Sequence, residues 1–332
     1  MLETFAYARA GLLGNPSDGY FGKTIALIAR NFRARVLLYP SARLEIKPSK
    51  ADMPVFESID DLYDTTRWRG YYGGIRIIQA LIVRFMDYCR EQKIELPNRN
   101  FTLEYESTIP LRLGMGGSSS IITAALRALC RYYSVVIPLP IQAKLVLETE
   151  TLELRVPAGP QDRVIQVYEG LVYMDFSKEL MEQRGYGEYD PLDPKLLKNA
   201  YLAYRTTLSE GTEVFHNNVR ERFHRGDADV VDAMRRWAEI AAEGRHALLS
   251  GDYPKLNALV NENFDLRSKI YKISDGNLEM IHAARKVGAS SNFAGSGGAV
   301  VGFYPDEAAY EELVREMKTL DVAVVKPIVV PK

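Results

Sequence analysis

The 332-residue sequence has few of the residues that most often carry redox chemistry or bind transition metals, since it contains two cysteines and four histidines. Cys89 and Cys130 each lie in an amphipathic helical pattern, so we expect buried free thiols rather than a disulfide or a metal site. The histidines lack the spacing of zinc ligands, and we interpret them as core or surface residues. They are His216, His224, His246 and His282.

Long hydrophobic runs and an excess of charge are also missing. No segment is apolar over the length that spans a bilayer, and the N-terminus has no basic region followed by an apolar signal core. The formal net charge is −1 at pH 7, and no basic stripe is interleaved with aromatic residues. These features argue against membrane and nucleic-acid partners. We expect a cytoplasmic globular protein, monomeric or homodimeric, that binds small molecules.

Hydrophobic residues make up 47% of the chain, which is enough for two cores of domain size. Short apolar runs between turn residues predict a strand-rich layer over residues 5–48, and mixed polar and apolar spacing predicts a mostly helical region over 211–286. We expect an α+β protein with two domains, residues 1–190 and 191–332. The segment Asp190–Pro194, with two prolines in five residues, is the best linker candidate.

The segment Ile109–Ile121, IPLRLGMGGSSSI, which we call the serine loop, lies between a predicted strand over residues 101–107 and a predicted helix over 121–133. Its glycines allow unusual backbone conformations and let an anion approach peptide N–H groups. The three serines then open the helix, where hydroxyls can cap it or bind a metal beside the positive end of the dipole. The pattern predicts a nucleotide phosphate site, although an ordinary glycine turn with a serine cap would also explain it. The loop matches neither the Walker A nor the GxGxxG pattern.

Three glycine-containing motifs occur along the chain, near its start, its middle and its end: RAGLLGNPSDGYFGKT, PLRLGMGGSSSI and NFAGSGGAVVGF. Their order and separation resemble the GHMP kinases, which phosphorylate small sugars and alcohols with ATP. The middle motif of that family has the form P-x-x-x-G-L-G-S-S, with Gly117 here replacing its first serine. The resemblance implies that ATP binds at Pro110, Gly114, Met115, Gly116, Gly117, Ser118, Ser119 and Ser120. It also implies that Ser118 or Ser119 contacts Mg²⁺.

The segment ETETLELRVPAGPQDRVIQVYEGLVYMDF narrows the resemblance, because it is similar to the corresponding segment of the glucuronokinases and of the heptose and fucose kinases grouped with them. GNPSDGYFGKT is most similar to the glucuronokinases. The resemblance implies a two-domain α+β fold, with an N-terminal ribosomal-protein-S5-like domain and a C-terminal ferredoxin-like domain carrying extra helices. It also implies transfer of the γ-phosphoryl group of ATP to the anomeric hydroxyl of D-glucuronate. The alternatives are a kinase for a heptose phosphate, fucose or galacturonate, and a non-catalytic sugar- or nucleotide-binding regulator.

The family match places Asp162 at the position of the catalytic base, where a carboxylate accepts the proton of the sugar hydroxyl. Arg9 corresponds to a basic residue near the first motif, and its fixed charge would keep Asp162 ionised and stabilise the transferred phosphoryl group. Glu150 would help to hold Mg²⁺, with Glu148 and Glu153 as competitors. Alternatively, Asp162 caps the following helix and Arg9 lies at the surface.

The predicted sugar site draws on the first and third motifs. Short polar side chains in GNPSDGY suit directional hydrogen bonds to sugar hydroxyls, although this stretch is also a strong turn signal. The glycines of GSGG would allow the backbone to approach the phosphate loop and the sugar closely, although a simple hairpin turn would also explain these glycines. By resemblance, the sugar-binding residues are Asn15, Ser17, Asp18, Gly295, Ser296 and Gly297.

A uronate also needs a cationic partner for its carboxylate, preferably a guanidinium. Candidates within or beside the motif-like segments are Lys23, Arg67, Arg69 and Arg163. Trp68 could stack on the adenine ring, although an aromatic residue near the start of a helix is more often part of the core.

Overall fold

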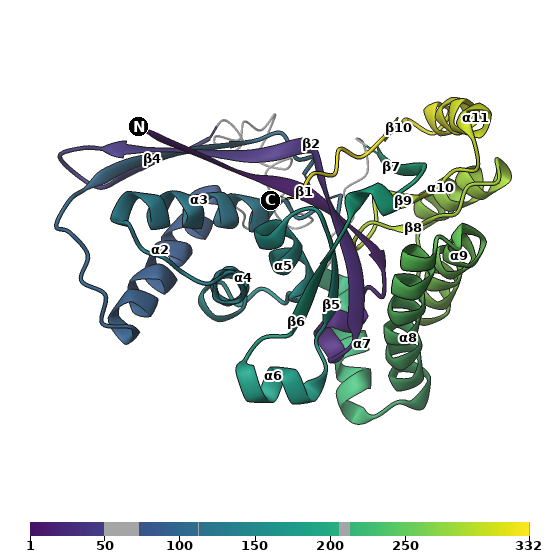
Figure 1. The fold of residues 1–332 in the computed structure, drawn as a ribbon, viewed down its shortest axis with the longest axis horizontal. Coiled ribbons are helices and arrows are strands. Elements are labelled where there is room, and N and C mark those ends of the chain that lie inside the picture. Colours follow the sequence, from purple (N-terminus) through teal and green to yellow (C-terminus); the bar gives the residue numbers. More distant parts are fainter. Residues whose placement is uncertain (50–72, 112, 206–212, 332) are drawn as a thin grey trace, which may run out of the picture.

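The computed structural model describes residues 1–49, 73–111, 113–205 and 213–331 of the chain (Figure 1). Six of the described strands form one sheet, with neighbours in the order β3, β4, β2, β5, β6, and with β1 paired to β2. All of these pairings are antiparallel except that of β3 with β4. The strands are β1 (Leu2–Leu13), β2 (Lys23–Pro40), β3 (Glu45–Lys47), β4 (Phe101–Ser107), β5 (Leu171–Asp175) and β6 (Glu188–Leu192).

β2 organises this sheet, because three strands pair with it. β1 lies antiparallel along almost its whole length, whereas β4 pairs with its C-terminal part and β5 with its N-terminal part. From Thr4 to Tyr7, the residues of β1 alternate between buried and partly exposed, but from Ala8 to Leu13 every residue is buried. The register of β1 shifts between Tyr7 and Ala8. Arg9 therefore enters the interior of the molecule directly after a bulge.

Helices cover one face of this sheet, and Figure 1 shows α2, α3, α4 and α5 together on that side of β1, β2 and β4. The strand predicted over residues 101–107 is confirmed by β4. The predicted helix after the serine loop is also present, but it begins at Gly117 because the serines form its first turn. The helices and short helical turns of this part are η1 (Ser17–Tyr20), α2 (Gly74–Glu91), α3 (Gly117–Tyr133), α4 (Leu139–Glu148), η3 (Thr149–Glu153), α5 (Gln161–Tyr168) and α6 (Lys178–Arg184).

The C-terminal part contains a smaller antiparallel sheet of four described strands, in the order β10, β7, β9, β8. In chain order these are its fourth, first, third and second strands, and helices separate β7 from β8 and β9 from β10, as in a ferredoxin-like domain. Its elements are η4 (Pro194–Leu196), β7 (Ala200–Arg205), α7 (Glu213–Arg225), α8 (Ala228–Ser250), α9 (Tyr253–Ile270), α10 (Asp275–Lys286), β8 (Asn292–Phe293), β9 (Ala299–Phe303), α11 (Glu307–Lys318) and β10 (Val322–Val325). The helical region predicted over residues 211–286 is confirmed by α7 to α10. No described helix is long and apolar enough to cross a bilayer.

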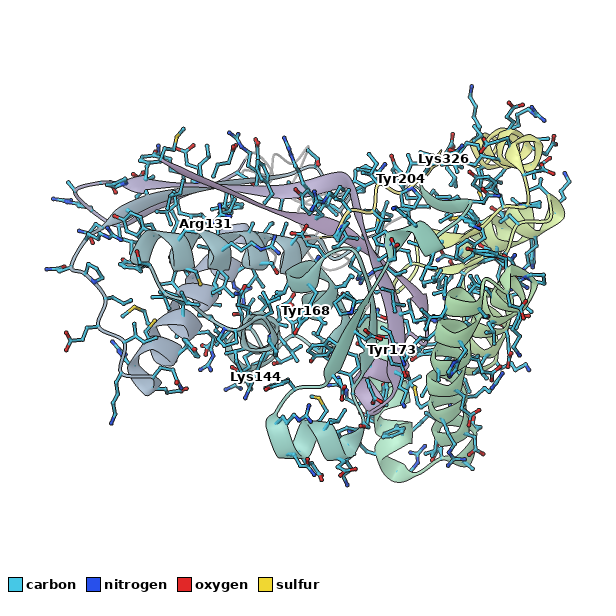
Figure 2. The ribbon with its side chains drawn as sticks, viewed as in Figure 1. Arg131, Lys144, Tyr168, Tyr173, Tyr204 and Lys326 are labelled. Carbon is cyan, nitrogen blue, oxygen red and sulfur yellow. The ribbon has the colours of Figure 1, made fainter. Side chains whose placement is uncertain are left out.

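The two sheets are joined by a shared hydrophobic core. One cluster of buried residues contains Leu27 of β2, Leu202 of β7 and Trp237 of α8. Phe32 of β2 packs edge-to-face on Tyr204 of β7, with ring centroids 5.2 Å apart, and Figure 2 shows Tyr204 near the bend of β2. Residues contributed by both parts of the chain are therefore held in one fixed arrangement.

The predicted linker is wrong over Asp190–Leu192. These residues form the end of β6, where Asp190 lies opposite Tyr173 and Leu192 opposite Leu171. β6 is an edge strand, and an edge position tolerates a proline because its missing N–H is not needed by a second neighbour. The chain therefore leaves the larger sheet only after Leu192, and the domain division at residue 190 stays a prediction.

Cys89 and Cys130 are both free thiols, as predicted. Cys89 is buried in α2 and Cys130 is partly buried in α3. Burial raises the pKa of Cys130 to about 12, so this thiol stays protonated and unreactive at neutral pH.

Candidate active site

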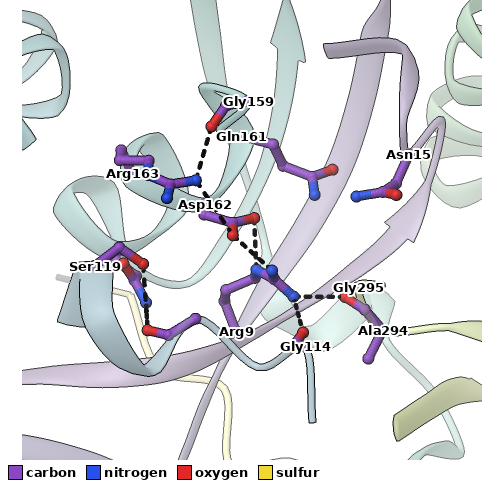
Figure 3. Close-up of polar contacts among 12 residues, drawn as sticks. Arg9, Asn15, Gly114, Ser119, Gly159, Gln161, Asp162, Arg163, Ala294 and Gly295 are labelled. Carbon is purple, nitrogen blue, oxygen red and sulfur yellow. Dashed lines mark hydrogen bonds and ion pairs between the residues drawn. The ribbon is translucent and has the colours of Figure 1, made fainter. Parts of the chain in front are cut away.

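Arg9 lies where the three motifs meet (Figure 3). Its Nε donates to Oδ1 of Asp162 and its Nη2 donates to Oδ2, each at 2.6 Å. Its Nη1 donates to the carbonyl oxygen of Gly114 and, at 2.7 Å, to that of Ala294. Arg9 is only 5% exposed, so its two parallel hydrogen bonds to Asp162 form a buried bidentate ion pair. One guanidinium thus connects β1, the serine loop, α5 and the third motif.

Asp162 is the second residue of α5, and 17% of its side-chain surface remains accessible. Burial alone would raise the pKa of Asp162, but the guanidiniums of Arg9 and Arg163 outweigh burial and hold this pKa below its ordinary value. The carboxylate is therefore ionised at neutral pH. Because each carboxylate oxygen can accept two hydrogen bonds, the pairing with Arg9 orients Asp162 without exhausting its acceptors.

A second buried ion pair lies beside the first. Nε of Arg163 donates to Oε2 of Glu150 at 2.6 Å, and Nη2 donates to the same oxygen. Nη1 of Arg163 donates to the carbonyl oxygen of Gly159 at 2.8 Å and lies 3.4 Å from Oδ2 of Asp162. Burial raises the pKa of Glu150, and the charge of Arg163 opposes that rise. The guanidinium of Arg163 is thus already bound to protein carboxylates.

The serine loop presents the N-terminus of α3 without a side-chain cap. Gly114 and Gly116 have φ values of 60° and 75°, in the left-handed region that favours glycine. A Cβ at Gly117 would approach no atom closer than Cγ2 of Ile109 at 3.9 Å, so the space beside this residue is open. The first N–H groups of a helix lack intrahelical partners and lie at the positive end of its dipole. This terminus is therefore suited to an anion.

The three serines of the loop have different surroundings. Ser118 is partly exposed at the start of α3. The hydroxyl of Ser119 donates to the carbonyl oxygen of Gly116 at 3.2 Å. The hydroxyl of Ser120 accepts from Nε2 of Gln166 at 2.7 Å and contacts the carbonyl oxygens of Gly116 and Tyr7. Ser120 thus holds the loop against β1 and α5, and Ser119 is buried as well, so Ser118 is the most accessible of the three.

Asp18, from the first motif, caps α5. Its Oδ2 accepts a hydrogen bond from the backbone N–H of Gln161 at 3.1 Å. Residue 159 must be small here, because a Cβ on Gly159 would lie 2.2 Å from the same oxygen. Burial, assisted by the charge of Asp162, raises the pKa of Asp18 to about 6. The predicted sugar motif therefore touches the residue that precedes the predicted base.

Asn15 is held by α9 of the C-terminal part. Nη2 of Arg267 donates to Oδ1 of Asn15 at 2.6 Å, and Nη1 donates to the carbonyl oxygen of Gly295 at 2.5 Å. One turn earlier, Asn263 accepts from the N–H of Gly14 at 2.8 Å and donates to the carbonyl oxygen of Asn15 at 3.4 Å. The first and third motifs are thus joined through one helix.

The third motif packs directly on the serine loop. A Cβ at Gly295 would lie 2.1 Å from the carbonyl oxygen of Gly114, and a Cβ at Gly114 would lie 2.7 Å from the backbone nitrogen of Ser296. Gly297 has a φ of 136°, which side-chain-bearing residues rarely adopt. The glycines predicted at these positions therefore permit a close backbone approach between two distant segments.

Two predicted sugar-binding residues are engaged elsewhere. Nζ of Lys23 lies 2.9 Å from Oδ2 of Asp175. The hydroxyl of Ser17 is buried and donates to the carbonyl oxygen of Lys23 at 3.0 Å. The first of these contacts joins β2 to β5 and the second holds the turn between β1 and β2, and neither joins the network around Arg9.

Of the remaining predicted residues, two belong to the serine loop and three lie outside the described part of the chain. Met115 is buried, and its carbonyl oxygen accepts from the N–H of Arg9 at 3.1 Å. Pro110 is partly buried at the entrance to the serine loop. Trp68, Arg67 and Arg69 lie outside the described residues.

Sequence reasoning missed Gln161, Asn263 and Arg267. The buried residues of α9 recur at helical spacing and are Leu256, Leu259, Val260, Asn263, Phe264 and Arg267. An amide and a guanidinium on the otherwise apolar face of a helix are unusual, because such groups are rarely buried without a specific partner. That pattern is the signal that would have found two of the three residues.

Comparison with known proteins gives consistent matches. The family described as GHMP kinases N terminal domain matches residues 80–170, and the GHMP kinases C terminal family matches residues 245–321. The chain is 44% identical to Glucuronokinase 1 of Arabidopsis thaliana, over 95% of this chain and 88% of that protein. It is 43% identical to Probable glucuronokinase 2 of the same plant, over 99% of this chain and 91% of that protein.

A similar fold occurs in the solved structure of Streptococcus pneumoniae phosphomevalonate kinase in complex with phosphomevalonate and AMPPNP. The TM-score is 0.78 at 14% sequence identity, and the match covers 99% of this chain and 100% of that one. At this identity the likeness concerns the fold alone. It confirms the two-domain α+β fold expected from the sequence.

Proposed function

Because this chain belongs to the GHMP kinase family, we propose that it transfers the γ-phosphoryl group of ATP to the anomeric hydroxyl of D-glucuronate, giving glucuronate 1-phosphate. The observation that carries the proposal is the pairing of Arg9 with Asp162, since Arg9 also binds the serine loop through Gly114 and the third motif through Ala294. The two glucuronokinase relatives support the choice of sugar.

Asp162 serves in this proposal as the proton acceptor. As the anomeric oxygen forms its bond to the γ-phosphorus, the bond from that phosphorus to ADP breaks and the hydroxyl proton passes to the carboxylate. An anomeric hydroxyl is more acidic than an ordinary alcohol, so a carboxylate with a low pKa is an adequate base. Arg9 cannot accept a proton because its guanidinium stays charged. It orients Asp162 and stabilises charge on the transferred group.

The phosphates are assigned to the N-terminus of α3, and Mg²⁺ to oxygen atoms beside it. The hydroxyls of Ser118 and Ser119 and the carboxylate of Glu150 have the chemistry that Mg²⁺ prefers. Both bonds from Arg163 end on Oε2 of Glu150, so they leave Oε1 to a further partner. The described residues contain no group of three or more histidine, cysteine or acidic side chains placed to hold a metal. Mg²⁺ would therefore take most ligands from phosphate and water, and would neutralise charge on the phosphates.

A uronate fits the charges of the site better than a sugar phosphate does. A phosphate on the substrate would require a cluster of unpaired basic residues. In the described part of the chain, the guanidiniums of Arg9 and Arg163 are already paired with Asp162 and Glu150. This pairing favours the single charge of a carboxylate over the larger charge of a heptose phosphate.

A screen of purified protein tests the proposal. ATP consumption would be measured against free uronates and neutral sugars, and the phosphorylated position of each product determined by NMR. We expect glucuronate to be the preferred acceptor, with the phosphate on its anomeric oxygen. Consumption that no sugar stimulates, or phosphate on another oxygen, would contradict the proposal. The cytoplasmic location expected from the sequence remains part of the proposal.

A further inference from the structure

Three buried arginines converge on the site, and two of them are paired with carboxylates. Arg9 binds Asp162 and Arg163 binds Glu150. Arg267, on α9, has no carboxylate oxygen within 4.0 Å among the described residues. It is nevertheless only 4% exposed. A buried charge without a counter-ion is costly, so proteins normally pair such a group.

The guanidinium of Arg267 has hydrogen-bond donors to spare. Of its five N–H groups, one binds Oδ1 of Asn15 and one binds the carbonyl oxygen of Gly295. The other three have no acceptor in the described part of the chain, and Nε is fully buried. The rings of Tyr271 and Phe293, each with its centroid 5.5 Å from Cζ, offset part of the charge through cation–π contacts. Both acceptors that Arg267 does bind are neutral.

Arg267 also lies beside the predicted reacting groups. The carbonyl oxygen of Ala294 accepts from Arg9, and the next carbonyl oxygen, that of Gly295, accepts from Arg267. The two guanidiniums are thus anchored to consecutive residues. In a pyranose, C1 and the carbon that bears the C6 carboxylate are both attached to the ring oxygen. A hexuronate ring therefore presents its anomeric hydroxyl and its carboxylate close together, as the site presents Asp162, paired with Arg9, and Arg267.

Two amides lie beside these two residues, that of Gln161 next to Asp162 and that of Asn15 on Arg267. Gln161 is fully buried directly before Asp162 in α5. Neither amide atom of Gln161 forms a well-aligned hydrogen bond with a described residue. Figure 3 shows the amides of Gln161 and Asn15 pointing toward one another above Arg9. Unfilled amide donors and acceptors suit sugar hydroxyls, which need both.

We infer that Arg267 binds the carboxylate of a hexuronate substrate, while the amides of Asn15 and Gln161 bind ring hydroxyls. The inference rests on the proposed sugar-kinase function and assigns its substrate class to a residue. A planar carboxylate accepts two parallel N–H bonds from a guanidinium. A neutral hexose would leave the buried cation without a hydrogen-bonded anion, so the site selects against it.

The test compares glucuronate with glucose, which carries a hydroxymethyl group in place of the carboxylate. Arg267→Gln should lower the ratio of kcat/KM for glucuronate over glucose about 100-fold. The loss should appear in KM for glucuronate, with KM for ATP unchanged. Arg285→Gln is the matched control, because Arg285 contacts the same helix through Asp265 at 2.7 Å and the carbonyl oxygen of Asn261 at 3.0 Å. This control should keep the wild-type ratio.

An Arg267→Gln enzyme that folds and keeps the wild-type ratio overturns the inference. If that variant does not fold, Arg267→Lys becomes the test, because lysine keeps the positive charge but cannot donate two parallel hydrogen bonds to a carboxylate. It should lower the ratio about 10-fold, and a wild-type ratio would again overturn the inference. If the wild-type protein phosphorylates no sugar, the proposed function fails instead. Calorimetric binding of glucuronate would then still have to be lost in Arg267→Gln and kept in Arg285→Gln.

Discussion

The phosphate side and the sugar side of the site differ in how their buried charges are balanced. On the phosphate side, the guanidiniums of Arg9 and Arg163 each bind a carboxylate. On the sugar side, Arg267 has no carboxylate partner among the described residues, and Gln161 has unfilled amide atoms there. Buried polar groups are normally satisfied within a protein. The phosphate side therefore has its charge partners before any ligand binds, whereas the sugar side would receive its missing partners from the substrate.

This comparison has a consequence for mutagenesis. Removing one partner on the phosphate side leaves an orphaned charge in the empty protein, so both stability and turnover should change. Changes on the sugar side should act mainly on substrate affinity and selectivity.

The largest effect is expected for Asp162→Asn. An amide cannot accept the hydroxyl proton, so kcat should fall about 1,000-fold or more. ATP affinity should change little, because the serine loop and the N-terminus of α3 remain intact. Turnover by a coupled ADP assay and ATP affinity by calorimetry would check both statements. Retained turnover would exclude Asp162 as the base.

Stability must be measured for the same variant. Asparagine accepts fewer hydrogen bonds from Arg9 and leaves its charge uncompensated, at a cost of about 3 kcal/mol in the free energy of unfolding. Urea unfolding provides this value, and the kinetic assays should be run where the variant is fully folded. Loss of ATP binding in a folded protein would mean that Asp162 maintains the whole network rather than the chemical step.

Gly295→Ala should have the next largest effect. The added Cβ would lie 2.1 Å from the carbonyl oxygen of Gly114 and 2.7 Å from Nη1 of Arg9, so the third motif and the serine loop would have to separate. We expect a loss of about 3 kcal/mol in unfolding free energy, together with a lower kcat. Gly19→Ala is the control, because a Cβ there would meet no atom within 4 Å. Equal stability of the two variants would contradict the close packing of the motifs.

The order of strands and helices was predictable from the sequence where periodicity is strong. β4 and the helices from α7 to α10 follow the apolar spacing, and the serine loop follows from its glycines. The predicted linker failed at Asp190–Leu192 because prolines that often mark a loop are also tolerated on an edge strand. Local composition does not distinguish these two cases.

The site was predictable only in part, for a different reason. Asp162 and Arg9 were proposed through motif resemblance, but their bidentate pairing depends on a contact between residues 153 positions apart. Arg267 lies outside every motif, and its importance appears only when α9 packs against Asn15 and Gly295. Such long-range convergence depends on the tertiary fold and leaves no short-range spacing in the sequence.

The smallest predicted effect concerns the pH dependence of stability at Asp18. Burial raises its pKa in the folded protein to about 6, above the value of 3.8 for an exposed aspartate. Between these values the folded state binds more protons than the unfolded state, so this group lowers the unfolding free energy as the pH rises from about 4 to 6. Asp162 has the opposite sign, because its lowered pKa contributes stability that is lost on acidification.

Asp18→Asn should therefore stabilise the empty protein by about 3 kcal/mol at pH 7.5 and by about 1 kcal/mol at pH 4.5. The amide oxygen of asparagine can still accept from the N–H of Gln161, so the cap of α5 is retained. Urea unfolding of both proteins at the two pH values measures the difference. An equal gain at both pH values would contradict the raised pKa of Asp18 in the folded protein.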